Sequence, residues 1–153
     1  NAIMGGQLLL GESTEKVVPE TVALQQYAPK GLLLTLYFDF DSAELTPESV
    51  NRLQHFLSEM GKYDYEELVF DGYADEMGSD AYNYRLSARR AEKVAAFLRN
   101  NGVESPFTTE GHGRIKLSEA EINEEISRYP WTEGGVDWIR VNRRARRVEI
   151  YNK

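Results

Sequence analysis

The sequence contains no cysteine and only two histidines, His55 and His112. The absence of cysteine excludes disulfides, a thiolate nucleophile and cysteine-ligated zinc or iron–sulfur centres. The two histidines are far apart and match no metal-ligand spacing, so we expect no metal site, no cofactor and none of the usual metallohydrolase chemistry. We interpret His55 as a surface residue and His112 as a loop residue without a catalytic role.

Long apolar runs are also missing, because no stretch approaches the roughly 18 consecutive apolar residues of a membrane-spanning helix. No signal peptide is evident, and Asn1-Ala2 is compatible with a cloning remnant after the loss of a leader or anchor. We therefore expect membrane attachment only through an N-terminal anchor or fused domain outside this chain. The 153 residues, 41% hydrophobic and 28% charged, predict a single globular domain.

Charge is unevenly distributed along the chain. Residues 140–153 hold six basic side chains and one acidic residue, Glu149, whereas the whole chain has a formal net charge of −7. An acidic body argues against broad binding of a phosphate backbone. The C-terminal arginine cluster nevertheless leaves a nucleic-acid-binding module as an alternative function.

Apolar periodicity predicts strands and helices in alternation after a lead-in segment, residues 1–30, that holds a short helix from Val22 to Tyr27. We expect Leu34, Leu36, Phe38 and Phe40 to share one buried strand face. The order β-α-β-α-β-α-β predicts an α+β fold, with two main helices and an extra helix packed on one mixed four-stranded sheet. The expected strands are 32–40, 67–74, 107–110 and 147–151, and the expected helices are 46–61, 80–100 and 118–129.

Local signals mark several of these boundaries. Thr46-Pro47 is typical of a helix start, and Ser118 with Glu121 forms a capping-box pattern. We expect Gly111-His112-Gly113 to close the third strand and the run 119–125 to be a solvated helix face. Trp131 and Trp138 are candidates for a sugar-stacking platform, although packing in the core or in a lid is the favoured interpretation.

The helix expected over residues 80–100 carries two polar side chains on its apolar face. Advancing about 100° per residue places Asn83 and Arg90 inside the arc of Leu86, Ala91, Val94 and Leu98. An arginine in that position requires a partner, because burying an unpaired guanidinium is costly.

Asp75, in the loop before this helix, is the expected partner of Arg90, because helical arginine side chains lean toward the helix N-terminus. The helix N-terminus adds free amides and a partial positive charge. Such a pocket suits a zwitterion, with Asp75 holding an ammonium and Arg90 a carboxylate. The alternative is an internal salt bridge between the two.

Three segments of the chain carry a family resemblance: FDFDSAEL at 38–45, GYADEMGSDAYN at 72–83 and LSARRA at 86–91. They resemble the OmpA-like C-terminal (OmpA/MotB/Pal) peptidoglycan-binding domain family over residues 32–113 and 145–151. The resemblance implies a βαβαβαβ domain, here residues 31–153 with a long insertion at 114–144. It also implies non-covalent binding of the diaminopimelate in the peptidoglycan stem peptide.

The resemblance also implies a role for each site residue. Asp75 corresponds to the aspartate that pairs with the diaminopimelate ammonium, and Arg90 to the arginine that pairs with its carboxylate. Asn83 and Asp41 correspond to supporting polar contacts, and Ala74 contributes through its backbone.

A further arginine depends on the register of the C-terminal motif. The family's Asn-Arg-Arg-Val appears here as ARRV at 145–148, which puts Arg146 at the first arginine and leaves the asparagine missing. Asn142-Arg143-Arg144 offers a second register, ranked lower because residues 148–150 supply the expected strand. In the first register, Arg143, Arg144 and Arg147 are surface charge.

The function expected from the resemblance is that of a non-enzymatic cell-wall anchor in the periplasm of a Gram-negative bacterium. It is attached to the outer or inner membrane through a region outside this chain. Porin tails, lipoproteins, stator components and secretion accessories share this domain. We expect no catalysis, because the candidate pocket lacks a metal set, an activated nucleophile and a paired acid and base. A cell-wall hydrolase is a third, lower-ranked interpretation.

Overall fold

A computed structural model of the chain describes residues 28–129 and 134–153. The expected helix from Val22 to Tyr27 lies outside the described residues, and so does Trp131. The elements, in chain order, are β2 (Gly31–Tyr37), α2 (Pro47–Met60), β3 (Leu68–Ala74), α3 (Asp80–Asn100), β4 (Phe107–Arg114), α4 (Glu119–Arg128), α5 (Trp138–Val141), the 3-10 turn η1 (Arg143–Ala145) and β5 (Arg147–Asn152).

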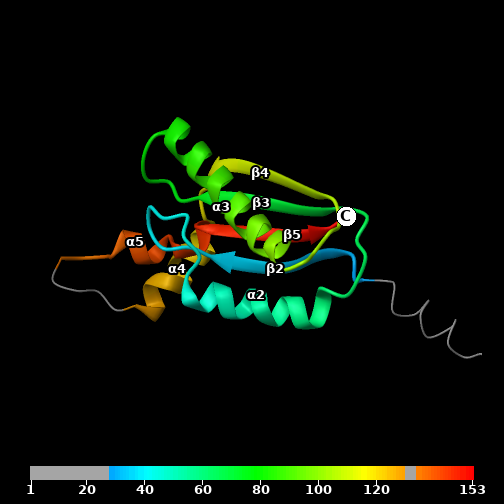
Figure 1. The fold of residues 1–153 in the computed structure, drawn as a ribbon. Helices are drawn as coiled ribbons and strands as arrows, with labels where there is room; N and C mark the ends of the chain where they lie inside the picture. Colours follow the sequence, from blue (N-terminus) through cyan, green and yellow to red (C-terminus); the bar gives the residue numbers. More distant parts are fainter. Residues whose placement is uncertain (1–27, 130–133) are drawn as a thin grey trace, which may run out of the picture.

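The four described strands form one mixed sheet in the order β2-β5-β3-β4. Strand β5 is antiparallel to both β2 and β3, whereas β3 and β4 run parallel. Figure 1 shows α2 and α3 on the same face of this sheet, with α2 along β2 and α3 across β3 and β4. The predicted α+β fold is therefore confirmed. None of the helices among the described residues is long and apolar enough to cross a membrane.

The helices begin where their capping residues place them. The Thr46 side chain accepts a hydrogen bond from the Ser49 amide at 3.0 Å, and Pro47 is the first residue of α2. Ser79 caps α3 in the same way, and Ser118 and Glu121 form the predicted capping box at α4. These predictions hold because a cap is a contact within three residues of chain.

The first strand ends earlier than predicted. Leu36 and Phe38 are buried as expected, but Phe40 is 42% exposed, so its assignment to the buried face was wrong. The ladder continues only as far as Phe38, whose amide donates to the Arg146 carbonyl at 2.8 Å. Asp41 then adopts a φ of 55°, and this left-handed backbone turns the chain away from the sheet.

The third strand is longer than predicted, because β4 continues through Gly111, His112 and Gly113 to Arg114. The expectation that these residues form a closing loop was therefore wrong, and His112 lies in a strand. Gly111 provides space for the helix, because a Cβ on it would lie 2.6 Å from the Ala88 amide nitrogen of α3, whereas Gly113 adopts a left-handed φ of 77°. Strand glycines that allow another backbone to approach closely are a recurrent feature.

The segment between β4 and β5 contains a buried ion cluster that the sequence did not predict. Glu125 of α4 is fully buried and was wrongly expected on a solvated face. Its carboxylate accepts from Arg143 Nε at 3.0 Å and lies 2.7 Å from Arg144 Nε. Arg143 and Arg144 are therefore not the free surface charges expected, because they compensate a buried carboxylate.

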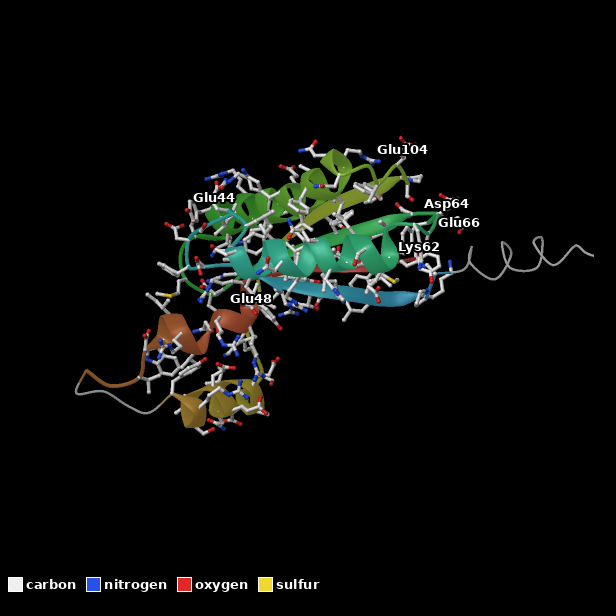
Figure 2. All side chains as sticks on the ribbon, turned by 60° about the horizontal axis from the view of Figure 1, so that its bottom comes forward. Glu44, Glu48, Lys62, Asp64, Glu66 and Glu104 are labelled. Atoms are coloured by element: carbon white, nitrogen blue, oxygen red, sulfur yellow. The ribbon has the colours of Figure 1, made fainter. Side chains whose placement is uncertain are left out.

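This cluster fixes α4 and η1 at one end of the sheet. Figures 1 and 2 show α4 and α5 beside one another there, at the end opposite the C-terminus. Trp138, the first residue of α5, is 52% exposed, so the favoured interpretation of this tryptophan as a packed residue was wrong. Arg147 pairs with Glu149 at 2.9 Å instead of remaining a free surface charge.

Replacing Gly111 by Ala is expected to lower the free energy of unfolding by about 2 kcal/mol, because the added Cβ overlaps the backbone of α3. Urea denaturation followed by circular dichroism measures this change. Thr109→Ala, an exposed site on the same strand, is the matched control and should stay within about 0.5 kcal/mol of wild type. Equal midpoints for Gly111→Ala and wild type would contradict the close approach of α3.

Glu125→Gln is expected to destabilise the fold by about 2–4 kcal/mol, because it removes the carboxylate that two guanidinium groups share. The matched control is Glu124→Gln. Glu124 also pairs with Arg144, but its side chain is 58% exposed, so the loss should be under about 1 kcal/mol. Thermal unfolding of both variants measures the difference. Similar melting temperatures would show that the buried position of Glu125 carries no special energetic weight.

Candidate ligand-binding site

A pocket of about 670 Å³ opens between the loop after β2 and the N-terminal end of α3. Four of the six predicted site residues line it: Asp41, Asp75, Asn83 and Arg90. Glu44, labelled in Figure 2, lies at the same end of the molecule, whereas Asp64, Glu66 and Glu104 lie at the far end. The complete lining is Phe40, Asp41, Asp75, Met77, Gly78, Ser79, Tyr82, Asn83, Leu86 and Arg90.

Arg90 is fully buried at the base of this pocket. Its guanidinium donates to three backbone carbonyls, those of Ser42 at 2.8 Å, Tyr73 at 2.9 Å and Asp39 at 3.1 Å. The prediction that Arg90 pairs directly with Asp75 was therefore wrong, because its hydrogen-bond partners are these carbonyls. Carbonyl groups from the loop after β2 and from the end of β3 satisfy this guanidinium instead of a carboxylate.

The electrostatic surroundings of Arg90 lower the pKa of its guanidinium to about 10. Loss of hydration on burial is the main cause, and the nearby positive charge of Arg146 acts in the same direction. Asp75 and Asp41 oppose this change because they are negative. Asp75 therefore acts on Arg90 through the electric field across the pocket, without a hydrogen bond between them.

The partner of Asp75 is Arg146. Arg146 Nη1 lies 3.3 Å from Asp75 Oδ2, and both side chains are buried. The other carboxylate oxygen, Oδ1, accepts from the Met77 amide at 3.1 Å, which closes the turn leading into α3. Arg146 also donates to the carbonyls of Phe38 at 3.0 Å and Ile139 at 2.7 Å. The structure thus brings Arg146 to Asp75, whereas Arg143 and Arg144 of the second register lie on Glu125.

The remaining predicted residues have supporting positions. Asn83 is buried, and its amide donates to the Met77 carbonyl at 2.8 Å. Ala74 is buried at the end of β3, where its carbonyl accepts from the Ile115 amide at 2.9 Å. Asp41 lies at the exposed rim and accepts a hydrogen bond from the Tyr82 hydroxyl, which raises the pKa of Tyr82.

The rim of the pocket also carries three apolar or aromatic side chains that were not predicted as site residues from the sequence. Phe40, Met77 and Tyr82 line it with 42%, 41% and 37% of their surface exposed. Helical spacing gave no indication of Tyr82, because its partner Asp41 is 41 residues away along the chain. The site thus combines a charged base with a partly apolar entrance, an arrangement typical of small-ligand sites.

The pocket lining combines one buried guanidinium, that of Arg90, with the carboxylates of Asp75 and Asp41. A second buried guanidinium, that of Arg146, pairs with Asp75 but is not part of the lining. Burying a positive charge is costly unless an anion compensates it. The arrangement therefore favours a ligand that brings a negative group to Arg90, while Asp41 at the rim offers an acceptor for a cation.

Comparisons with known proteins give consistent results. The chain is 36% identical over 80 residues to outer membrane protein A of Bordetella avium, which covers 52% of this chain and 41% of that protein. It is 32% identical over 107 residues to outer membrane protein A of Shimwellia blattae, covering 67% and 44% respectively. The chain thus spans less than half the length of these relatives.

Solved structures share the fold at low sequence identity. A peptidoglycan-associated lipoprotein from Burkholderia pseudomallei superimposes with a TM-score of 0.54 at 23% identity, covering 78% of this chain and 89% of that one. The periplasmic domain of Helicobacter pylori MotB gives a TM-score of 0.54 at 18% identity, covering 82% and 77%. The family model of the OmpA family matches residues 37–129, more than half of the sequence. The chain therefore belongs to the OmpA family.

Proposed function

We propose that this chain binds peptidoglycan non-covalently through the diaminopimelate of the stem peptide and so anchors an envelope protein to the cell wall. The observation that carries the proposal is the pocket lining, which brings the buried guanidinium of Arg90 together with the carboxylates of Asp75 and Asp41. A relative of the same fold is named a peptidoglycan-associated lipoprotein, which supports the choice of polymer.

Diaminopimelate suits this site because its side chain ends in both an ammonium and a carboxylate. Arg90 uses three of its five guanidinium N–H groups on backbone carbonyls, and in this proposal the other two bind the ligand carboxylate. Asp75 and Asp41 supply acceptors for the ammonium. Asn83 holds the Met77 carbonyl and thereby fixes the turn that positions Asp75.

The ligand carboxylate also relieves an energetic cost within the protein. Burial lowers the pKa of Arg90 to about 10, which means that the folded protein destabilises the guanidinium charge. A carboxylate beside Arg90 offsets that effect, because an opposite charge in a desolvated pocket favours the ionised form. Binding energy is therefore concentrated on the group that distinguishes diaminopimelate from lysine.

The arginine cluster near the C-terminus gives little support to nucleic-acid binding. Arg143, Arg144, Arg146 and Arg147 each have a carboxylate partner within 3.3 Å. A phosphate backbone would have to compete with these internal pairs. We also favour binding over catalysis, because the buried carboxylate of the pocket is already paired with Arg146 and none of the lining residues is a histidine.

We further propose that residues 31–153 act as one domain, in which 114–144 is an insertion that supports the site from outside the pocket. The basis is that α5 is joined to Arg146 through the Ile139 carbonyl at 2.7 Å. In this proposal the domain works in the periplasm, and a region outside this chain attaches it to the outer or inner membrane.

Calorimetry with two stem peptides tests this proposal. A peptide with lysine in place of diaminopimelate keeps the ammonium but lacks the terminal carboxylate. It should bind wild type at least thirtyfold more weakly, about 2 kcal/mol, because the free N–H groups of Arg90 lose their partner. Equal affinity of the two peptides would show that Arg90 does not bind that carboxylate.

Two variants test the role of Asp75 and the role of Arg90 separately. Asp75→Asn should weaken both peptides about equally, because both carry the ammonium. Arg90→Lys should mainly reduce the preference for diaminopimelate, because lysine lacks the planar fork that binds a carboxylate. Asp80→Asn is the matched control, since Asp80 is an exposed aspartate paired with Arg114 outside the pocket. A preference for diaminopimelate that survives in Arg90→Lys would contradict this assignment, provided that thermal unfolding shows the variant to be folded.

A further inference from the structure

The face of the sheet opposite α3 carries three side chains with metal-ligating groups. Asp71 of β3 lies opposite Glu110 of β4 in the parallel register, and His112 follows two residues after Glu110. Their neighbours Gly72 and Gly111 face α3, where an added Cβ would overlap its backbone. Because side chains alternate between the two faces of a strand, Asp71, Glu110 and His112 all project from the other face.

The ligating atoms of these residues lie close enough to share one ion. His112 Nε2 is 2.8 Å from Asp71 Oδ1 and 3.8 Å from Glu110 Oε1, and all three atoms lie within 4.8 Å of one another. Tetrahedral zinc with bonds of about 2.0–2.2 Å places neighbouring ligand atoms about 3.3–3.6 Å apart. The observed distances bracket that value, and the Glu110 side chain, 62% exposed, is free to adjust.

The charges across the sheet also favour a cation at this position. Glu149 of β5 lies opposite Asp71 on the other side, so three carboxylates form a row across β5, β3 and β4. Like charges directly opposite one another destabilise a sheet. Glu149 is paired with Arg147 at 2.9 Å. Within residues 28–129 and 134–153, the ion-pair partner of Asp71 and Glu110 is His112, which is charged only when protonated.

The imidazole ring has a defined orientation. His112 stacks on Tyr73 of β3 with a centroid distance of 5.0 Å and an interplanar angle of 17°. The guanidinium of Arg147 also lies over the Tyr73 ring, at 4.8 Å. Ligands held by rigid strands and by neighbouring contacts lose less freedom when a metal binds, so Tyr73 acts as an outer support for the metal-binding nitrogen.

We propose that Asp71, Glu110 and His112 form a binding site for a divalent first-row transition-metal ion, with Zn²⁺ as the ion that best fits one imidazole and two carboxylates. Imidazole favours zinc over calcium or magnesium, which prefer ligand sets made of oxygen alone. Three protein ligands leave at least one position for water. The site lies on the sheet face away from the pocket and does not depend on peptidoglycan binding.

Isothermal titration of the full chain with ZnCl₂ in a non-chelating buffer tests this proposal. We expect one zinc ion to bind with micromolar affinity, and the absence of cysteine keeps competing thiolate binding out of the experiment. His112→Gln and Asp71→Asn should each weaken binding at least tenfold. His55→Gln, at the other histidine of the sequence, is the matched control and should leave the affinity unchanged.

Nuclear magnetic resonance of the imidazole groups provides a readout in the unmodified protein. Zinc should shift the ring signals of His112 and leave those of His55 in place, and this result does not require any variant to fold. Zinc should also raise the thermal midpoint of wild type but not that of His112→Gln. The proposal is overturned if binding fails to saturate below millimolar zinc, or if His112→Gln binds zinc as tightly as wild type does.

Discussion

The buried guanidinium of Arg90 connects helix α3 with the loop after β2 and with the end of β3. Burial of this guanidinium is costly, and hydrogen bonds to the carbonyls of Asp39, Ser42 and Tyr73 offset the cost. Asp39 and Ser42 lie in the loop between β2 and α2, and Tyr73 lies near the end of β3. That loop provides Phe40 and Asp41 to the pocket. The shape of the pocket entrance therefore depends on a group placed by helix α3, far away in the sequence.

A second group of ion pairs, those of Glu125 and Asp75, connects the pocket to the segment between β4 and β5. Glu125 holds Arg143 and Arg144, and the turn that follows delivers Arg146 to Asp75. Arg146 in turn holds the Ile139 carbonyl of α5. These contacts connect α4 and α5 indirectly, through residues 143–146, to Asp75 of the pocket, although neither helix lines the pocket.

Sequence reasoning succeeded where the information is local or periodic. The caps at Thr46 and Ser118 act within three residues, and helical period placed Arg90 on the buried face. It failed where a partner carries no distinctive side chain: the three carbonyls that satisfy Arg90 belong to the backbone, which every residue has. The spacing to Asp75 therefore suggested a pair that the structure does not form.

Two further features depend on contacts between residues far apart in the sequence, which hydrophobic periodicity does not predict. Glu125 follows Ile122 by three residues and so shares a helix face with it, but the acidity of the surrounding run led to the prediction of a solvated position. The grouping of Asp71, Glu110 and His112 arises from the register of two parallel strands. A search for histidine spacing along one segment does not detect such a grouping.

The position of β5 makes the pairing of β2 with the rest of the sheet depend on this one strand. Among the described strands it is the last along the chain, yet it lies between β2 and β3, which have no direct pairing with each other. Arg146 directly precedes β5 and pairs with Asp75. One short segment, residues 146–152, therefore joins β2 to the rest of the sheet and also supplies the buried partner of the pocket carboxylate.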